Sequence, residues 1–228
     1  MTENSGNGSR KPATRKNTPV ARAWREAWSN PGFRLRLALT LPALVGVLAL
    51  LTRFLEVVEA RPGVTLPDPV LAVLAPRDLT WLTFGLIYAG LVIGVVRLST
   101  QPRGLVLALQ AYAVMVLLRI AAMYVTPLDP PPGMIPLNDP LVRLFGPGKL
   151  LTKDLFFSGH TSTLFLLGLA VSGWRSRAFF LSSAAAVAAC VLWQHVHYTI
   201  DVLAAPFFAY ASWRVAVLLD RNAGSDGA

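Results

Sequence analysis

The sequence predicts an all-α polytopic membrane protein, built as a bundle of six transmembrane helices. Hydrophobic residues make up 54% of the 228 residues and charged residues only 14%, whereas about 25% of the residues of a soluble domain are charged. The hydrophobic residues are gathered in blocks of about 20 residues, the length that spans the hydrocarbon core of a bilayer. The six blocks cover roughly residues 35–55, 79–97, 104–126, 157–174, 178–195 and 199–219.

Residues 1–33, ahead of the first block, predict a basic cytoplasmic tail. The first 20 or so residues are small, polar and basic. They offer too few apolar side chains to bury, so we expect them to be disordered. Trp24 and Trp28 follow at the i, i+4 spacing of one helix face, mixed with arginines. This pattern is typical of a short helix that lies at the level of the lipid headgroups.

The membrane domain is expected to cover residues 34–220, and residues 221–228 form a short cytoplasmic tail. Residues 58–60 weakly resemble a signal-peptide cleavage site. However, the first block is too long and its basic leader too extended for an ordinary signal peptide, so we interpret it as a span. Cys190 is the only cysteine, which excludes an intrachain disulfide and a cysteine-rich metal site.

The distribution of lysine and arginine predicts that both termini lie in the cytoplasm. With the N-terminus inside, fourteen basic residues fall on the cytoplasmic side and six on the outer side, while Arg119 lies within a span. This bias follows the positive-inside rule. The net charge of +9 is concentrated beside the first block, which favours a membrane surface over nucleic acid as the partner. The Ala, Leu, Val and Arg bias and the short loops are typical of a bacterial inner-membrane protein.

In this orientation the polar clusters of interest share the outer side of the membrane. The first cluster is His197 with Asp201, four residues apart and therefore on one face of a helix. The carboxylate can hold one imidazole nitrogen and leave the other as a base or a nucleophile. The structural alternative is a polar pair that caps a helix at the interface, and the pair alone does not decide between the two. His195 points to a different side of the helix, so we assign it a structural role.

The second cluster is Ser158-Gly159-His160, at the start of the fourth block. Serine is a preferred N-cap, and glycine lets the backbone approach a ligand closely. The free N–H groups of a helix start suit a phosphate, and His160 would lie over that phosphate and transfer a proton. The structural alternative is a capping motif with an interfacial histidine.

The third candidate is Arg119, seven residues before Thr126 and about 10 Å below the outer end of its span. An arginine inside a span is costly and marks a functional site, with an anion as its partner; snorkelling to the headgroups is the structural alternative. Two histidines, an aspartate, a buried arginine and a helix start together predict phosphoryl transfer through a phosphohistidine. We expect no metal and no cofactor, because a binuclear metal site would need more carboxylates or histidines.

These motifs resemble those of the sphingomyelin synthase family, a branch of the type-2 phosphatidic acid phosphatase (lipid phosphatase) superfamily. The resemblance spans the six blocks in order, roughly residues 35–215. The family patterns D-x3-S-G-H-T, H-Y-T-x-D-V and R-x6-T begin here at Asp154, His197 and Arg119. A Pro-rich family motif that ends in Leu-Pro-Asp is echoed at Leu66-Pro67-Asp68.

The resemblance implies a six-span bundle of the lipid phosphatase type with an outward-facing site. It implies that His197, oriented by Asp201, is the nucleophile and that His160 is the acid-base partner. The implied reaction moves phosphocholine or phosphoethanolamine from a membrane glycerophospholipid to ceramide or another lipid hydroxyl and releases diacylglycerol. The oligomeric state is left open. The substrate-binding residues that the resemblance implies are Arg119, Thr126, Asp154, Ser158, Gly159 and Tyr198.

Three departures from the family patterns bear on the substrate. Lys153 and the residue before it replace the Cys-Gly that precedes the aspartate in the synthase motif. The wider lipid phosphatases have two arginines that are absent here: Thr126 stands at the position of one, and Val191, six residues before His197, at the position of the other. A less cationic cradle favours a zwitterionic phosphodiester donor, although Lys153 would repel choline unless Asp154 or an aromatic face offsets it. The aromatic candidates, otherwise ordinary interfacial residues, are Tyr124, Phe157, Trp193 and Tyr198. Two alternatives stay open: a lipid phosphatase or phospholipase C-like hydrolase, and a non-catalytic membrane scaffold.

Overall fold

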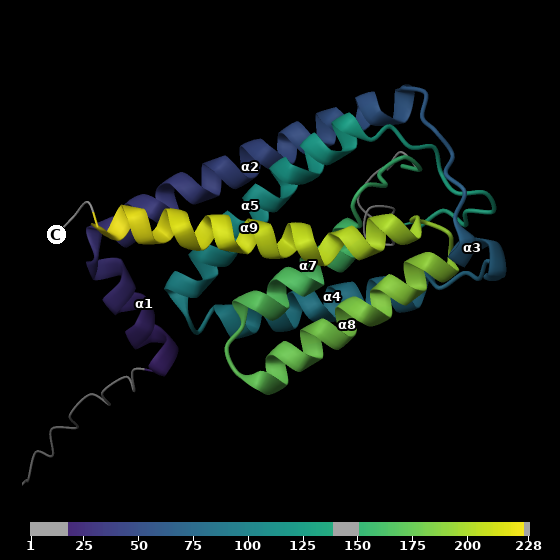
Figure 1. Ribbon diagram of the computed structural model, residues 1–228. Helices are drawn as coiled ribbons and strands as arrows, with labels where there is room; N and C mark the ends of the chain where they lie inside the picture. The colour runs from purple at the N-terminus through teal and green to yellow at the C-terminus, as the bar shows by residue number, and fades with distance from the viewer. Residues whose placement is uncertain (1–17, 139–150, 226–228) are drawn as a thin grey trace, which may run out of the picture.

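The computed structural model describes residues 18–138 and 151–225, where the regular elements are helices and one isolated β-bridge (Figure 1). The predicted all-α class is confirmed for these residues. Most of the tail expected to be disordered, residues 139–150 and the last three residues lie outside them. The helices are α1 (Pro19–Ser29), α2 (Pro31–Ala60), α3 (Pro69–Val73), α4 (Thr80–Leu98), α5 (Pro102–Val125), α7 (Gly159–Ala170), α8 (Trp174–Trp193) and α9 (Thr199–Ser225).

The short helix predicted around the first two tryptophans is α1. Asn30 ends α1 and caps α2, because its side chain accepts a hydrogen bond from the Phe33 N–H at 3.2 Å. Trp24 packs edge-on against Phe33 at 6.3 Å between ring centroids, and its indole N–H donates to the Ser99 carbonyl at 2.8 Å. The helix α1 is therefore docked across the end of the bundle, and its place at a membrane surface stays a prediction.

Among the residues that the structure describes, five helices are long and apolar enough to cross a membrane, which supports a polytopic membrane protein: Pro31–Ala60, Thr80–Leu98, Pro102–Val125, Trp174–Trp193 and Thr199–Arg221. The remaining predicted span, residues 157–174, contains α7 with only 12 residues. A helix of this length is about 18 Å long, well short of a hydrocarbon core of about 30 Å. The six-span count is therefore not confirmed. The helix is short because Ser158 caps its start and the chain turns at Gly173, where φ is +88°.

The short helix α7 lies in the middle of the bundle (Figure 1), in contact with α4, α5, α8 and α9. Leu164 on α7 is fully buried. Gly90 of α4 makes room for it, since a Cβ placed there would lie 2.4 Å from Leu164 Cδ2. Close approach at small residues is a common way for helices to pack within membranes. The polar motif at the start of α7 is therefore held inside the bundle.

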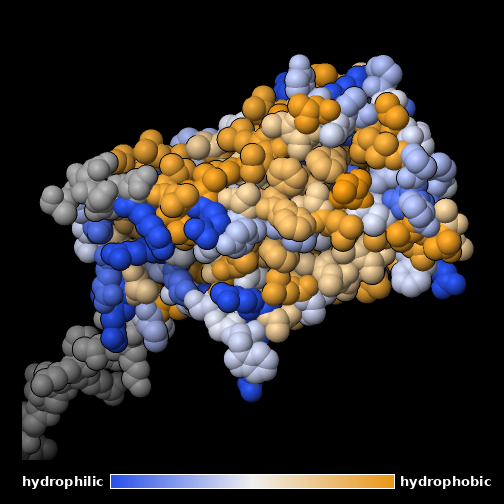
Figure 2. Space-filling model, in the orientation of Figure 1, coloured by the Kyte–Doolittle hydropathy of each residue, from blue (hydrophilic) through white to orange (hydrophobic). Residues whose placement is uncertain are grey.

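The first long helix, α2, is the most peripheral. Only 6% of its 18-residue hydrophobic stretch is buried, against 28% to 39% of the corresponding stretches in the other four long helices. The helix α2 packs mainly along α5. Apolar side chains cover the middle of the face drawn in Figure 2, with hydrophilic side chains toward both ends. This distribution is expected of a protein whose middle section is surrounded by the hydrocarbon core of a bilayer.

Candidate active site

Arg119 reaches from α5 to the loop that precedes α7. It lies six residues before Val125, the last residue of α5, and so about 9 Å below that helix end. Its Nε donates to the Phe157 carbonyl at 3.0 Å, and its Nη2 forms an ion pair with Asp154 Oδ1 at 2.7 Å. The Arg119 side chain is 12% exposed. A carboxylate from the predicted motif thus neutralises the intramembrane cation, as a buried charge requires.

The start of α7 is shaped around this guanidinium. Ser158 is the N-cap, and its Oγ accepts a hydrogen bond from the Thr161 N–H at 3.5 Å. Gly159 follows, and a Cβ at this position would lie 2.3 Å from Arg119 Nη1. The guanidinium therefore occupies space that any other side chain at position 159 would claim. The close approach expected from Gly159 is made here by Arg119.

We expect Gly159→Ala to lower the kcat/KM of the reaction catalysed at this site about 100-fold, because a misplacement of about 1 Å costs roughly that much. The added methyl must push the guanidinium away from its two partners. Gly85→Ala is the matched control, since no atom lies within 4 Å of a Cβ built there. Steady-state kinetics and thermal unfolding of both variants would check this. Equal activity of the two variants would contradict the positional role of Arg119.

His160 lines a cavity of about 210 Å³ together with Arg119, Asp154 and Gly159. Its imidazole stands edge-on to the Phe84 ring, with ring centroids 5.9 Å apart. The rest of the wall, mostly apolar and supplied by α2, α4, α5 and α7, consists of Leu51, Ile87, Leu91, Tyr112, Met115, Val116 and Thr163. The cavity thus has a small charged region next to an apolar wall, a combination that suits a lipid headgroup with an attached acyl chain.

The His197–Asp201 pair lies at the start of α9. His197 Nδ1 is 3.5 Å from Asp201 Oδ2, and the two residues are 1% and 0% exposed. Asp201 Oδ2 also accepts the Tyr198 N–H at 2.9 Å. Among the described residues, His197 Nδ1 and Asp201 Oδ1 have no hydrogen-bond partner. A small rotation of the ring would close the Nδ1 contact, which leaves Nε2 as the nitrogen available for chemistry.

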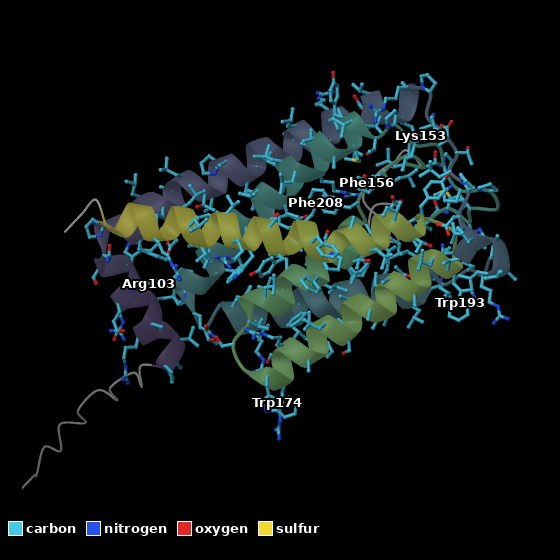
Figure 3. All side chains as sticks on the ribbon, viewed as in Figure 1. Arg103, Lys153, Phe156, Trp174, Trp193 and Phe208 are labelled. Atoms are coloured by element: carbon cyan, nitrogen blue, oxygen red, sulfur yellow. The ribbon has the colours of Figure 1, made fainter. Side chains whose placement is uncertain are left out.

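The two histidine motifs are joined through the backbone. The Ser158 N–H donates to the Asp201 carbonyl at 3.2 Å. Phe157 stacks on Phe208 of α9 with ring centroids 4.3 Å apart, and Phe156 meets Phe208 edge-on at 6.1 Å (Figure 3). These contacts hold the start of α7 against α9. The structure therefore links the predicted residues around Arg119 to those around His197, although His197 itself does not line the cavity.

Two predicted binding residues take other positions. The Thr126 hydroxyl donates to the Ala122 carbonyl of its own helix at 2.5 Å, and Thr126 is not among the cavity-lining residues. Tyr198 is 1% exposed, and its hydroxyl donates to the Asp129 carbonyl at 2.9 Å. Tyr198 thus supports the loop beside His197 and lies away from the cavity. Across residues 18–138 and 151–225, no three or more His, Cys, Asp or Glu side chains are grouped to hold a metal ion.

The Leu66-Pro67-Asp68 motif has a structural role that was not predicted from the sequence. Asp68 Oδ2 accepts the Thr199 N–H at 2.6 Å, and Oδ1 accepts the Thr199 hydroxyl at 2.9 Å. The same carboxylate caps α3 by accepting the N–H groups of Val70 and Leu71. Asp68 therefore holds the first residue of α9, which lies between His197 and Asp201 in the chain.

Asp68 makes the stability of this corner dependent on pH. Partial burial raises the pKa of its carboxyl, but the hydrogen bonds from Thr199, Leu71 and Val70 outweigh burial and bring the pKa below its ordinary value of 3.8. A pKa depressed on folding contributes stability that is present above the unfolded pKa and is lost as the pH falls through the folded pKa. The contribution is therefore complete at neutral pH and disappears below pH 3.8.

We expect Asp68→Asn to lower the unfolding temperature at neutral pH and to flatten its fall in acid, because the removed carboxylate no longer titrates. Activity should fall as well, since Thr199 loses its partner. Asp78→Asn is the matched control for the loss of activity: the Asp78 carboxylate accepts the Thr80 N–H at the start of α4 at 2.9 Å, whereas Asp68 holds the start of α9. Thermal unfolding from neutral to acidic pH checks this prediction. Parallel curves for wild type and Asp68→Asn would contradict it.

Gln194 and His195 form a second support; a structural role was predicted for His195 but not for Gln194. The fully buried Gln194 amide accepts the Leu79 N–H at 3.1 Å and donates to the Thr80 hydroxyl at 2.9 Å. The two His195 ring nitrogens lie 2.9 Å from the Pro132 carbonyl and 3.0 Å from the Leu74 carbonyl. These residues tie three loops together beside His197. A polar glutamine directly after an apolar segment was the available sequence signal, because such a residue is buried only with hydrogen-bond partners.

Residues 153–217 match the family model described as PAP2 superfamily C-terminal. The matched segment contains α7, α8 and most of α9, and with them Ser158, His160, His197 and Asp201. No curated protein matches the chain. The match does not separate the sphingomyelin synthase branch from other branches. It supports the type-2 phosphatidic acid phosphatase superfamily, whose members are phosphatases and phosphotransferases, as the family of the segment that carries both histidine motifs.

Proposed function

We propose that the protein is an integral membrane transferase of lipid phospho-headgroups. It moves phosphocholine or phosphoethanolamine from a glycerophospholipid to ceramide or another lipid hydroxyl, through a phosphohistidine on His197. Diacylglycerol is the other product. The observation that carries this proposal is the Arg119–Asp154 ion pair, which lies beside His160 in a cavity whose other walls are mostly apolar.

The ion pair matches a zwitterionic headgroup better than a phosphate monoester. Arg119 offers N–H donors to a phosphodiester, and Asp154 offers a carboxylate to an ammonium group. Among the described residues that line the cavity, Arg119 is the one arginine or lysine, so a doubly charged monoester would meet a single fixed cation there, with Asp154 repelling it. We therefore expect the donor phosphate to replace Asp154 on Arg119 and the donor ammonium to take up the released carboxylate.

Lys153 does not oppose a choline headgroup in this arrangement. Its ammonium forms an ion pair with Asp129 at 2.8 Å and donates to the Arg61 carbonyl at 2.7 Å. It lies at the end of the bundle (Figure 3) and is absent from the cavity wall. None of the four aromatic residues considered as headgroup contacts lines the cavity, whereas Tyr112 does. Tyr112 is thus the aromatic residue that we assign to the headgroup or the adjoining acyl region.

The chemistry divides into two steps. His197 Nε2 attacks the donor phosphorus, the bond from phosphorus to the glycerol oxygen breaks, and His160 protonates that oxygen, so diacylglycerol leaves. His160 then accepts the proton of the acceptor hydroxyl, whose oxygen attacks phosphorus and releases His197. Because His197 is 1% exposed, we expect the donor to displace Phe156 and Phe157, which pack against α9 ahead of Ser158, to bring phosphorus within reach. With these side chains in place His197 is shielded from water, which favours transfer over hydrolysis.

The charge of the described residues supports an outward-facing site. Nine exposed arginines lie at the end of the bundle away from His197: Arg22, Arg25, Arg34, Arg97, Arg103, Arg175, Arg177, Arg214 and Arg221. By the positive-inside rule this end is cytoplasmic. The site then faces the extracytoplasmic side, in a bacterial inner membrane by the compositional argument.

The test is a transfer assay with purified protein in mixed micelles. Phosphatidylcholine or phosphatidylethanolamine with a labelled headgroup is supplied with and without ceramide, beside the His197→Ala variant. The proposal expects labelled sphingolipid only when both ceramide and His197 are present. Water-soluble phosphocholine or phosphoethanolamine released regardless of ceramide would replace the transferase by a hydrolase. No product from any donor would favour the non-catalytic scaffold.

A further inference from the structure

A second cavity lies between α2, α5 and α9, at the end of the bundle away from the histidines. Its volume is about 280 Å³. The apolar part of its wall is formed by Leu39, Ala43, Ala113, Val114 and Leu219. The polar part is formed by Arg36, Thr40, Gln110 and Asp220. None of these residues belongs to the site described above.

Two of the polar residues lie well below the end of the bundle. Gln110 is eight residues from the start of α5 and Thr40 nine residues from the start of α2, which places both about 12 to 14 Å inside. Gln110 Nε2 donates to the Thr40 hydroxyl at 3.0 Å, and Thr40 is 5% exposed. Within the described part of the chain this is the one hydrogen bond recorded for the Gln110 side chain. The rest of its amide is left for a group that enters the cavity.

The mouth of the cavity carries charge. Arg36 forms an ion pair with the Asp220 carboxylate and donates from Nη2 to the Asp220 carbonyl at 3.1 Å. The two side chains remain 29% and 43% exposed, so both can reach a ligand. Nine exposed arginines lie at this end, against the described carboxylates of Glu26 and Asp220. The surroundings of the mouth are therefore strongly positive.

We propose that this cavity binds one anionic phospholipid from the leaflet opposite to the active site. The phosphate accepts from Arg36 at the mouth, where the positive potential of the neighbouring arginines favours an anion over a zwitterion. The ester region lies at the depth of Gln110, whose amide N–H is a donor for a lipid carbonyl. An acyl chain fills the apolar part of the cavity. The lipid carbonyl then gives the Gln110 amide the hydrogen-bond partner that a polar group at this depth in the membrane requires.

The bound lipid would join three helices that also build the active site. The helices α5 and α9 carry Arg119 and Asp201 at their other ends. A ligand that binds the folded bundle but not the unfolded chain raises its unfolding temperature by mass action. The site should therefore be detectable without any measurement of catalysis.

The test measures thermal unfolding of the full chain in neutral detergent with added phosphatidylglycerol or phosphatidylcholine. Lipid retained after washing is counted by native mass spectrometry. We expect phosphatidylglycerol to raise the unfolding temperature by about 5 °C, and phosphatidylcholine by much less. Arg36→Gln should abolish the difference and the retained lipid. Arg34→Gln, which removes an exposed arginine two residues away that does not line the cavity, should keep both.

Two further variants separate lipid binding from folding. Arg36→Gln leaves Asp220 without its partner, so Arg36→Gln/Asp220→Asn serves as the version without an unpaired charge, and it too should lose the lipid. Gln110→Leu removes the amide and keeps Arg36, and we expect weaker retention of phosphatidylglycerol. Equal stabilisation by both lipids, or equal losses in Arg34→Gln and Arg36→Gln, would reduce the effect to general attraction by the basic end and overturn the site.

Discussion

His197→Ala is expected to lower headgroup transfer by at least about 10⁴-fold, the scale seen when a nucleophile that acts with its partners is removed. The reason is chemical: without the imidazole there is no nitrogen to form the covalent intermediate. Asp201→Asn should cost less, because the amide keeps the contact with the ring but no longer stabilises its charged form. Rates from single-turnover assays with labelled donor check both variants.

His160→Ala provides the contrast within the same site. It removes the proton donor and acceptor but keeps the nucleophile, and we expect a loss of about 10² to 10⁴. Far-ultraviolet circular dichroism and unfolding temperatures should show that all three variants fold. If His197→Ala retains more activity than His160→Ala, then His197 is not the nucleophile.

Arg119→Gln is the second large effect, with an expected loss in kcat/KM of about 10³-fold, because Arg119 supplies charge to the phosphorus centre as it reacts. The same change leaves the Asp154 carboxylate without its partner. Because Asp154 is 27% exposed, solvent offsets part of this penalty, and we expect a loss of stability of about 2 kcal/mol rather than the larger value for a fully buried charge.

The double variant Arg119→Gln/Asp154→Asn separates the two consequences. Removing the second charge should recover most of the stability, because a neutral pair replaces an unpaired carboxylate. It should recover none of the activity, because the phosphate still lacks its cation. Urea unfolding and transfer kinetics on the same preparations check this. Recovery of both quantities together would mean that Arg119 acts through folding alone.

The membrane class and most of the long helices were predictable because hydropathy and length decide them. The exception is α7, where residues 164–171 continue the polar start of the block as an apolar run but only the 12 residues of α7 are helical. Hydropathy records burial in lipid and burial in protein in the same way. A helix enclosed by α4, α5, α8 and α9 therefore looks like a span in the sequence, although it is too short to be one.

The grouping around Arg119 was predictable in kind but not in detail. An intramembrane arginine needs an anion, and the sequence pointed to a ligand as that anion. In the structure Asp154 takes this place, because it stands four residues before the N-cap Ser158, in the loop that precedes α7, and its carboxylate reaches back to α5. The contact of Asp68 with Thr199 was not predictable, since 131 residues separate the two in the chain. Pairings between distant loops depend on the packing of all the helices.

The most direct measurement traps the intermediate. The protein is mixed with phosphatidylcholine labelled in the headgroup, without acceptor, and quenched rapidly under alkaline conditions that preserve phosphohistidine. Peptides are then mapped by mass spectrometry, before and after addition of ceramide. We predict phosphocholine on His197, absent in His197→Ala, and its complete conversion to labelled sphingolipid once ceramide is added. Sphingolipid formed with no adduct on His197, or an adduct that only water removes, would contradict the proposed transfer.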